Sequence, residues 1–126
     1  MAVVGVGVDA IEIDRVGRAI ERTPRLVDRV FTAREQGHCS AAIGRRRMAR
    51  FAARFAAKEA VAKALGTGVV GFGFRDIEIV NGDLGAPVVL LDARAQAVAA
   101  RVGVTKLHVS LSFTRDTAVA TAVAES

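Results

Sequence analysis

Two acidic side chains and a lysine stand out as residues that could do chemistry together. Asp9 follows a short apolar stretch, while Glu59 and Lys63 are four residues apart in an alanine-rich segment. Helical residues at this spacing share a face, so this carboxylate and ammonium would point the same way. Two carboxylates among many cations fit Mg²⁺, which takes few protein ligands and keeps phosphate and water oxygens. Ordinary roles remain open: Asp9 as a helix cap, and Glu59 with Lys63 as a surface ion pair.

The segment that carries Glu59 also contains cations and very small side chains. An arginine run opens it at residues 45–47 and 50, and alanine occupies positions 52, 53, 56, 57, 60, 62 and 64. The arginines either form a solvated face or attract a metal-bound polyphosphate. The alanines either serve as helix formers or allow a backbone or ligand to approach closely. Lys58 lies near an apolar stripe on the helical wheel. Its ammonium is therefore expected either to reach past that stripe into solvent or to contact a phosphate.

Other motifs offer weaker chemistry. Cys39 is the single cysteine, and the adjacent His38 does not make it a catalytic dyad. His108 is more typical of a hydrogen-bonded strand residue, and with two histidines and one cysteine a zinc site is not expected. The glycines of residues 5–10 resemble a dinucleotide-binding fingerprint, but that fold requires parallel βαβ units, and Asp9 would oppose a pyrophosphate.

Periodicity and capping residues divide the chain into early helices and later strands. Thr23-Pro24 reads as one helix start, and Thr32 with Glu35 forms a capping box for the next. The turn at 81–85 favours a β-hairpin, and another turn near 114–116 separates the last two alternating runs. Helices are expected over 11–22, 24–30, 33–43, 45–65 and 92–102, with strands over 2–8, 76–79, 88–91, 107–112 and 118–123. The fold class is therefore α+β, with helices packed on a small antiparallel sheet in one domain, residues 1–126.

Composition limits the class of protein. The chain has 126 residues, 52% hydrophobic residues and a net charge of +5, enough apolar side chains for a core and a bias toward anionic partners. No membrane-spanning run or leader is expected, which favours a cytoplasmic protein. A basic nucleic-acid-binding module remains the alternative function. Because base-stacking aromatics are scarce and that module leaves Asp9 and Glu59 without a role, a nucleic-acid partner is not expected.

Four motifs together resemble the holo-acyl-carrier-protein synthase family of phosphopantetheinyl transferases. They are GVDAIEIDRV at 7–16, FTAREQ at 31–36, RFAAKEAVAKALGTG at 54–68 and HVSLS at 108–112. The resemblance implies a Mg²⁺-dependent enzyme that transfers 4′-phosphopantetheine from coenzyme A to a serine of apo-acyl carrier protein, leaving adenosine 3′,5′-bisphosphate. It also implies a homotrimer with each coenzyme A site between neighbouring subunits.

The resemblance also assigns roles to particular residues. Asp9 and Glu59 would hold Mg²⁺, Glu59 would accept the serine proton directly or through a metal-bound water, and Lys63 would stabilise the departing phosphate. Phe55, Lys63 and Gly66 would line the coenzyme A site, with Arg50 and Arg54 near its phosphates or the protein partner and with Pro87 and Thr114 from the adjacent subunit. Lys58 is added to this site as the phosphate contact considered above. The acyl carrier protein would dock on Arg15, Arg18, Arg22, Arg25 and Leu26. Phe113 departs from the family, which commonly has histidine there, so one adenosine-phosphate contact would be missing.

Overall fold

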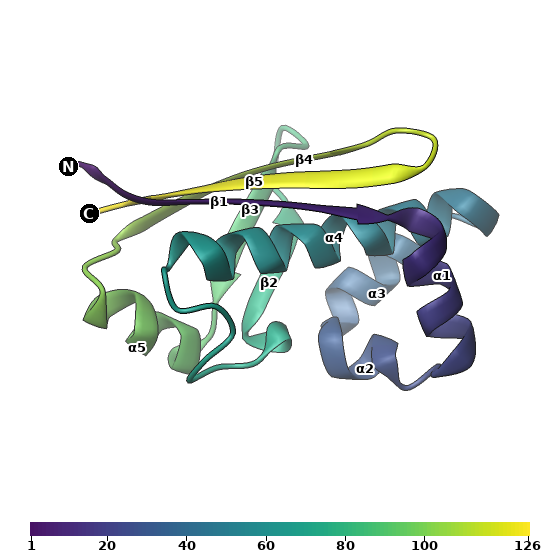
Figure 1. Cartoon of the computed structure of the whole chain (residues 1–126), viewed down its shortest axis with the longest axis horizontal. Coiled ribbons are helices and arrows are strands. Elements are labelled where there is room, and N and C mark those ends of the chain that lie inside the picture. Colours follow the sequence, from purple (N-terminus) through teal and green to yellow (C-terminus); the bar gives the residue numbers. More distant parts are fainter.

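One long helix forms the centre of the molecule, and an antiparallel sheet covers one of its sides (Figure 1). The computed structural model describes residues 1–126. The helix is α4 (Gly44–Ala64), and the sheet has the order β1 (Val3–Glu12), β5 (Thr117–Glu125) and β4 (Lys106–Phe113). The first and last strands of the chain are therefore neighbours, paired from Val3 with Glu125 to Glu12 with Thr117.

The remaining elements pack around α4. Near its start are three short helices, α1 (Ile13–Arg22), α2 (Leu26–Val30) and α3 (Ala33–Ser40) (Figure 1). The 3-10 turn η1 (Phe74–Asp76) leads into the hairpin of β2 (Ile77–Asn81) and β3 (Pro87–Leu91), which lies behind the middle of α4, and α5 (Ala93–Arg101) lies near the end of α4 (Figure 1). The α+β prediction with antiparallel strands is confirmed.

Small residues bring the sheet unusually close to α4. The alanines of β5 at 118, 120, 122 and 124 are buried, with exposed fractions of 1% or less. Gly5 and Gly7 on β1 face the helix, where an added Cβ would overlap the carbonyl oxygens of Ala64 and Ala60. The glycines of the first strand thus serve helix–strand packing. β1 belongs to an antiparallel sheet and not to a parallel βαβ unit, which agrees with the argument from the sequence against a dinucleotide-binding fold.

The opposite face of the same sheet is exposed and apolar. Its valines at 4, 6, 8 and 119 are between 38% and 61% exposed. Only one face of β1 is therefore buried, although most of its residues are apolar. The alanine face of β5 packs against α4 within the chain.

Several predicted element boundaries are corrected. Asp9 does not cap α1: it lies within β1 opposite Ala120, and Glu12 occupies the N-cap without a side-chain bond. Thr23 ends α1 rather than starting α2, which begins at Leu26. The capping box is confirmed, since Thr32 Oγ1 accepts from Glu35 N and Glu35 Oε1 accepts from Thr32 N. None of the helices combines the length and apolar character needed to cross a membrane.

Candidate active site

Asp9, Glu59 and Lys63 meet where β1 runs along α4. The Lys63 ammonium donates to the backbone oxygen of Val8 at 3.0 Å and to Asp9 Oδ1 at 3.3 Å. Glu59 stands one helical turn before Lys63 and lines the same cleft as Asp9. The two carboxylates singled out from the sequence are therefore brought together by two elements that are about fifty residues apart in the chain.

The surroundings of Glu59 make its negative charge less favourable. Partial burial raises the pKa of the Glu59 carboxyl, and the nearby Asp9 charge raises it further, while Lys63 acts in the opposite direction. A carboxylate with a raised pKa accepts a proton more readily, which suits a general base. The same repulsion between carboxylates would be relieved by a bound cation.

The residues present fit a magnesium ion. Asp9 and Glu59 supply only oxygen donors, and no group of three or more candidate ligands, which a protein-enclosed metal would use, exists in the chain. Mg²⁺ characteristically binds through one or two carboxylates and completes its shell with water and phosphate oxygens. The two carboxylates are half-buried on rigid elements, with Lys63 beside them to balance additional negative charge.

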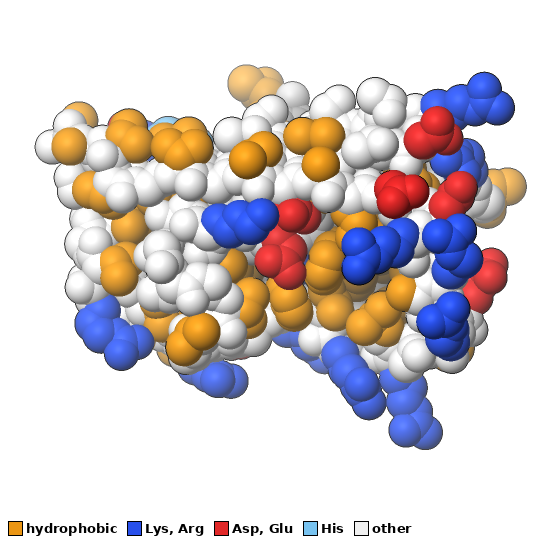
Figure 2. Space-filling view, in the orientation of Figure 1, with side chains coloured by type: hydrophobic (Ala, Val, Ile, Leu, Met, Phe, Trp, Pro, Cys, Tyr) orange, Lys and Arg blue, Asp and Glu red, His pale blue; other side chains and the backbone are white.

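A cleft of about 450 Å³ extends from these carboxylates between α1, α2 and α4. Most of its lining is apolar. The charged lining residues are Asp9, Arg15 and Glu59, and the apolar ones are Ala10, Ile11, Val16, Ala19, Ile20, Leu26, Val30, Phe31 and Phe55. In the space-filling view, acidic side chains in the middle of the face adjoin apolar ones, with cationic side chains on the α1 side (Figure 2). The site thus joins a charged end to an apolar one.

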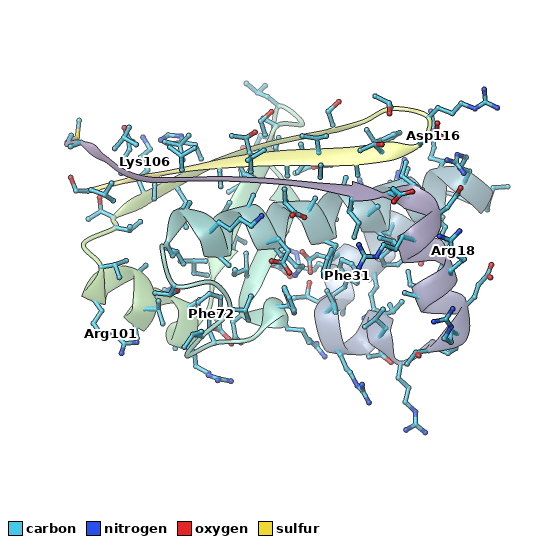
Figure 3. All side chains as sticks on the ribbon, viewed as in Figure 1. Arg18, Phe31, Phe72, Arg101, Lys106 and Asp116 are labelled. Carbon is cyan, nitrogen blue, oxygen red and sulfur yellow. The ribbon has the colours of Figure 1, made fainter.

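The expected carrier-docking residues border this cleft. Arg15 and Leu26 belong to its lining, and Arg18, Arg22 and Arg25 are exposed on α1 and just before α2. Figure 3 shows Arg18 pointing outward from α1. The buried side of α1 is formed by Ile13, Val16, Gly17 and Ile20. Arg15, Arg18 and Arg22 lie on the exposed side of α1, beside the carboxylates.

Lys58 differs from both expectations for it. Its side chain has no exposed surface, and its ammonium donates to Glu35 Oε1 at 2.7 Å and to the backbone oxygens of Phe74 and Ile77 at 3.0 and 2.5 Å. The predictions that it reaches solvent or binds a coenzyme A phosphate are wrong. Glu35, the acid that forms an ion pair with the buried ammonium, comes from α3 and could not be assigned to Lys58 from helical spacing.

Most of the other residues expected to bind coenzyme A lie outside the cleft, with Phe55 as the exception. Phe55 lines it and packs on Phe74, with ring centres 5.4 Å apart. Arg50 donates to the His38 backbone oxygen at 2.8 Å, and Arg54 is 4% exposed and donates to Asn81 Oδ1 at 3.3 Å. Gly66 ends α4 with a φ of 81°. None of the arginines among these residues reaches the cleft in this chain.

Pro87 and Thr114 also lie outside the cleft. Pro87 begins β3, and Thr114 forms the turn between β4 and β5, where its backbone N–H donates to Thr117 at 2.8 Å. Phe113 and Thr114 border a separate hollow of about 230 Å³ together with Arg45, Arg46 and Arg115. This hollow places the unusual phenylalanine among three cations.

Residues 5–123 match the family profile of the 4′-phosphopantetheinyl transferase superfamily. The chain therefore belongs to this superfamily. A holo-[acyl-carrier-protein] synthase from Clostridium novyi is 47% identical over 124 residues, covering 98% of this chain and 88% of the relative. Within the superfamily, the chain is accordingly an enzyme of the holo-[acyl-carrier-protein] synthase type.

Solved structures agree with this assignment. The crystal structure of holo-[acyl-carrier-protein] synthase from Neisseria meningitidis has a TM-score of 0.90 at 31% identity and covers 99% of this chain and 100% of its own. The enzyme from Bacillus anthracis, solved in complex with CoA (3′,5′-ADP), has a TM-score of 0.83 at 34% identity, with 98% and 97% coverage. The fold seen here is thus that of known synthases.

Sequence reasoning missed the depth of the cleft and two of its supports. Phe31, which is labelled in Figure 3, lines the cleft between α2 and α4. Its ring packs on that of Phe51 of α4, with ring centres 4.9 Å apart. Glu35 was recognised only as a capping residue, although its carboxylate also pairs with Lys58. A buried lysine needs a buried acid to compensate its charge, but the sequence does not indicate which acidic residue provides it.

Proposed function

We propose that this single-domain enzyme transfers 4′-phosphopantetheine from coenzyme A to a serine of an apo-acyl carrier protein in a Mg²⁺-dependent reaction. The observation that carries the proposal is the convergence of Asp9 and Glu59, with Lys63 bound to Asp9, at the mouth of an apolar cleft. A synthase with 34% identity was solved with CoA (3′,5′-ADP), which supports coenzyme A as the donor. A cytoplasmic location stays a prediction.

The side chains of the site can carry out the transfer. Asp9 and Glu59 would hold Mg²⁺, which when bound would make the diphosphate more electrophilic and neutralise developing charge. Glu59 accepts the proton from the carrier serine, either directly or through a water. The serine oxygen forms a new bond to the phosphorus of the pantetheine arm, and the bond to adenosine 3′,5′-bisphosphate breaks. Lys63 stabilises the charge on that leaving phosphate.

The two substrates occupy different parts of this surface in the proposal. The pantetheine arm follows Phe55 into the apolar cleft, and Gly66 permits close approach at the end of α4. The acidic carrier docks on Arg15 and Leu26 at the cleft and on the exposed Arg18, Arg22 and Arg25. Arg50 and Arg54 stay predictions as phosphate contacts, since neither lines the cleft.

We propose a homotrimer in which Pro87 and Thr114 complete the site of the adjacent subunit. Their position outside this chain's own cleft supports the proposal, as does the exposed valine face of the sheet, an apolar surface that association would cover. Light scattering should give three times the chain mass. Mixing Glu59→Ala chains with Thr114→Ala chains should restore activity if sites are shared. A fully active monomer would exclude both ideas.

The central test is mass spectrometry of an apo-carrier after incubation with enzyme, coenzyme A and Mg²⁺. The carrier should gain one phosphopantetheine, and adenosine 3′,5′-bisphosphate should appear in equal amount. EDTA should stop the gain, and added Mg²⁺ should restore it. Coenzyme A with Mg²⁺ should also raise the melting temperature, whereas duplex DNA should not. No mass gain on any carrier, despite a folded enzyme, would reject the proposed function.

A further inference from the structure

The Glu35–Lys58 ion pair lies in the interior of the molecule, and Lys58 is the helix residue next to Glu59. Both side chains are fully buried, and all three ammonium donors of Lys58 are used by Glu35, Phe74 and Ile77. The acid is equally occupied: Glu35 Oε1 also accepts from Thr32 N at 2.9 Å, and Oε2 accepts from Ile79 N at 2.8 Å. No proton or donor is left over, so the pair has no part to play in contact with substrate.

These bonds join three elements to one point of α4. Glu35 belongs to α3, Phe74 to η1, and Ile77 and Ile79 to β2. A further bond, from Thr32 Oγ1 to Glu78 Oε2 at 2.6 Å, fixes the start of α3 to the same strand. A buried ion pair is a costly way to obtain stability alone, because well-packed apolar residues often serve as well. What the ion pair adds is that α3, η1 and β2 can bind α4 in only one arrangement.

That geometry is transmitted to the cleft. Lys58 immediately precedes Glu59 in the helix, and on the β1 side Gly7 fits closely against Ala60, so α4 is fixed from two directions around Glu59. The ammonium also lies 5.6 Å from the ring centre of cleft-lining Phe31. The Phe74 backbone oxygen that it binds belongs to the residue packed on Phe55.

We propose that Glu35 and Lys58 are positioning residues for the transfer reaction: they fix the rotation and depth of α4 that place Glu59 opposite Asp9. This inference rests on the proposed function of Asp9 and Glu59. Because a misplacement of about 1 Å can lower a rate roughly a hundredfold, loss of the pair should reduce kcat far more than it weakens substrate binding.

Lys58→Met keeps the length of the side chain and removes the ammonium. Its kcat should fall about a hundredfold, with KM for carrier and coenzyme A within about threefold of the wild type. Val98→Ala is the matched control, because Val98 is 2% exposed in α5 and lines no part of the cleft. It should lower the urea midpoint while leaving kcat near normal. Equal loss of kcat in both variants, at comparable folded fractions, would overturn the proposal.

Glu35→Asp keeps both charges and provides a second variant if Lys58→Met does not fold. It withdraws the carboxylate by one methylene, so kcat should fall about tenfold at nearly unchanged KM, and Lys58→Arg should retain more activity than Lys58→Met. Wild-type kcat in folded Glu35→Asp would overturn the positioning role. Wild-type enzyme that modifies no carrier would instead reject the proposed function, so the two failures are distinguishable.

Discussion

Gly7 lies against Ala60 so closely that a side chain on the glycine would overlap the helix carbonyl oxygen. Two residues later on the same strand is Asp9, and one residue earlier on the same helix is Glu59. The distance between the two carboxylates therefore depends on the smallest residue of the sheet.

Gly7→Ala should push β1 away from α4, destabilising the fold by roughly 3 kcal/mol and lowering transfer activity as Asp9 withdraws from Glu59. Gly37→Ala is the control, because nothing lies within 4 Å of a Cβ at that helical position, and it should stabilise the fold by about 0.5–1 kcal/mol. Urea denaturation and carrier mass gain measure the two effects. A stable, fully active Gly7→Ala would contradict the packing argument.

Asp9→Ala and Glu59→Ala should each reduce carrier modification about a hundredfold or more while leaving the circular dichroism spectrum intact. Both side chains are only half-buried at the cleft, so their removal takes charge from the site and little packing from the core. Near-normal turnover by a folded variant at limiting Mg²⁺ would show that the residue is not a metal ligand.

Arg15→Glu should raise the carrier KM about tenfold at low salt and leave the coenzyme A KM nearly unchanged, because we propose that the acidic carrier docks on Arg15 and the exposed arginines beside it. The difference should shrink at high salt, where attraction is screened. Arg101→Glu makes the same charge change on α5, at the end of the molecule away from α1 (Figure 3), and should have little effect. If both reversals weaken carrier binding alike, only net charge matters.

Phe113→His should lower the coenzyme A KM by about tenfold or more without changing kcat. Phe113 is 44% exposed and borders the hollow with Arg45, Arg46 and Thr114, where we propose that the adenosine 3′-phosphate binds. A new charge-assisted hydrogen bond there is worth roughly 1.5–3 kcal/mol. Dephospho-coenzyme A, which lacks that phosphate, should gain nothing. Equal improvement for both substrates would mean that position 113 does not face the phosphate.

Cys39 should resist thiol reagents in the folded enzyme. Burial raises the pKa of the Cys39 thiol to about 11, although the charge of Arg54 acts in the opposite direction, and the side chain has no exposed surface. At pH 8 only about one thiol in a thousand would be ionised even if reagents could reach it. Labelling should proceed only when urea unfolds the chain. Rapid labelling without urea would show that the α3 region opens readily.

Much of this fold could be predicted because its elements are short and carry local signals. The Thr32–Glu35 capping box, the hairpin turn and the alternation in the last two strands all correspond to observed elements. Asp9 was harder to place, since a polar residue after an apolar run is equally typical of a helix cap and of a strand residue that faces a cleft. Only its pairing with Ala120 decides between them.

Parts of the site depended on contacts that no local pattern contains. Glu59 and Lys63 could be paired from their spacing within one helix. Lys58 could not be paired with Glu35, because the acid is 23 residues away and lies on another helix. The cleft was missed for the same reason: Val16, Val30 and Phe31 look like core residues in the sequence, and packing of three helices leaves space between them.

The pairing of β1 with β5 also determines when the enzyme can become active during its synthesis. Asp9 leaves the ribosome long before Ala120, its partner on β5, which lies more than a hundred residues later in the chain. Contacts this distant in sequence form slowly, and a nascent chain that lacks β5 leaves one edge of β1 unpaired. The early helices can form before that strand emerges. The strand that carries Asp9 is therefore fixed beside Glu59 last, so truncated translation products should contain helices but no transferase activity.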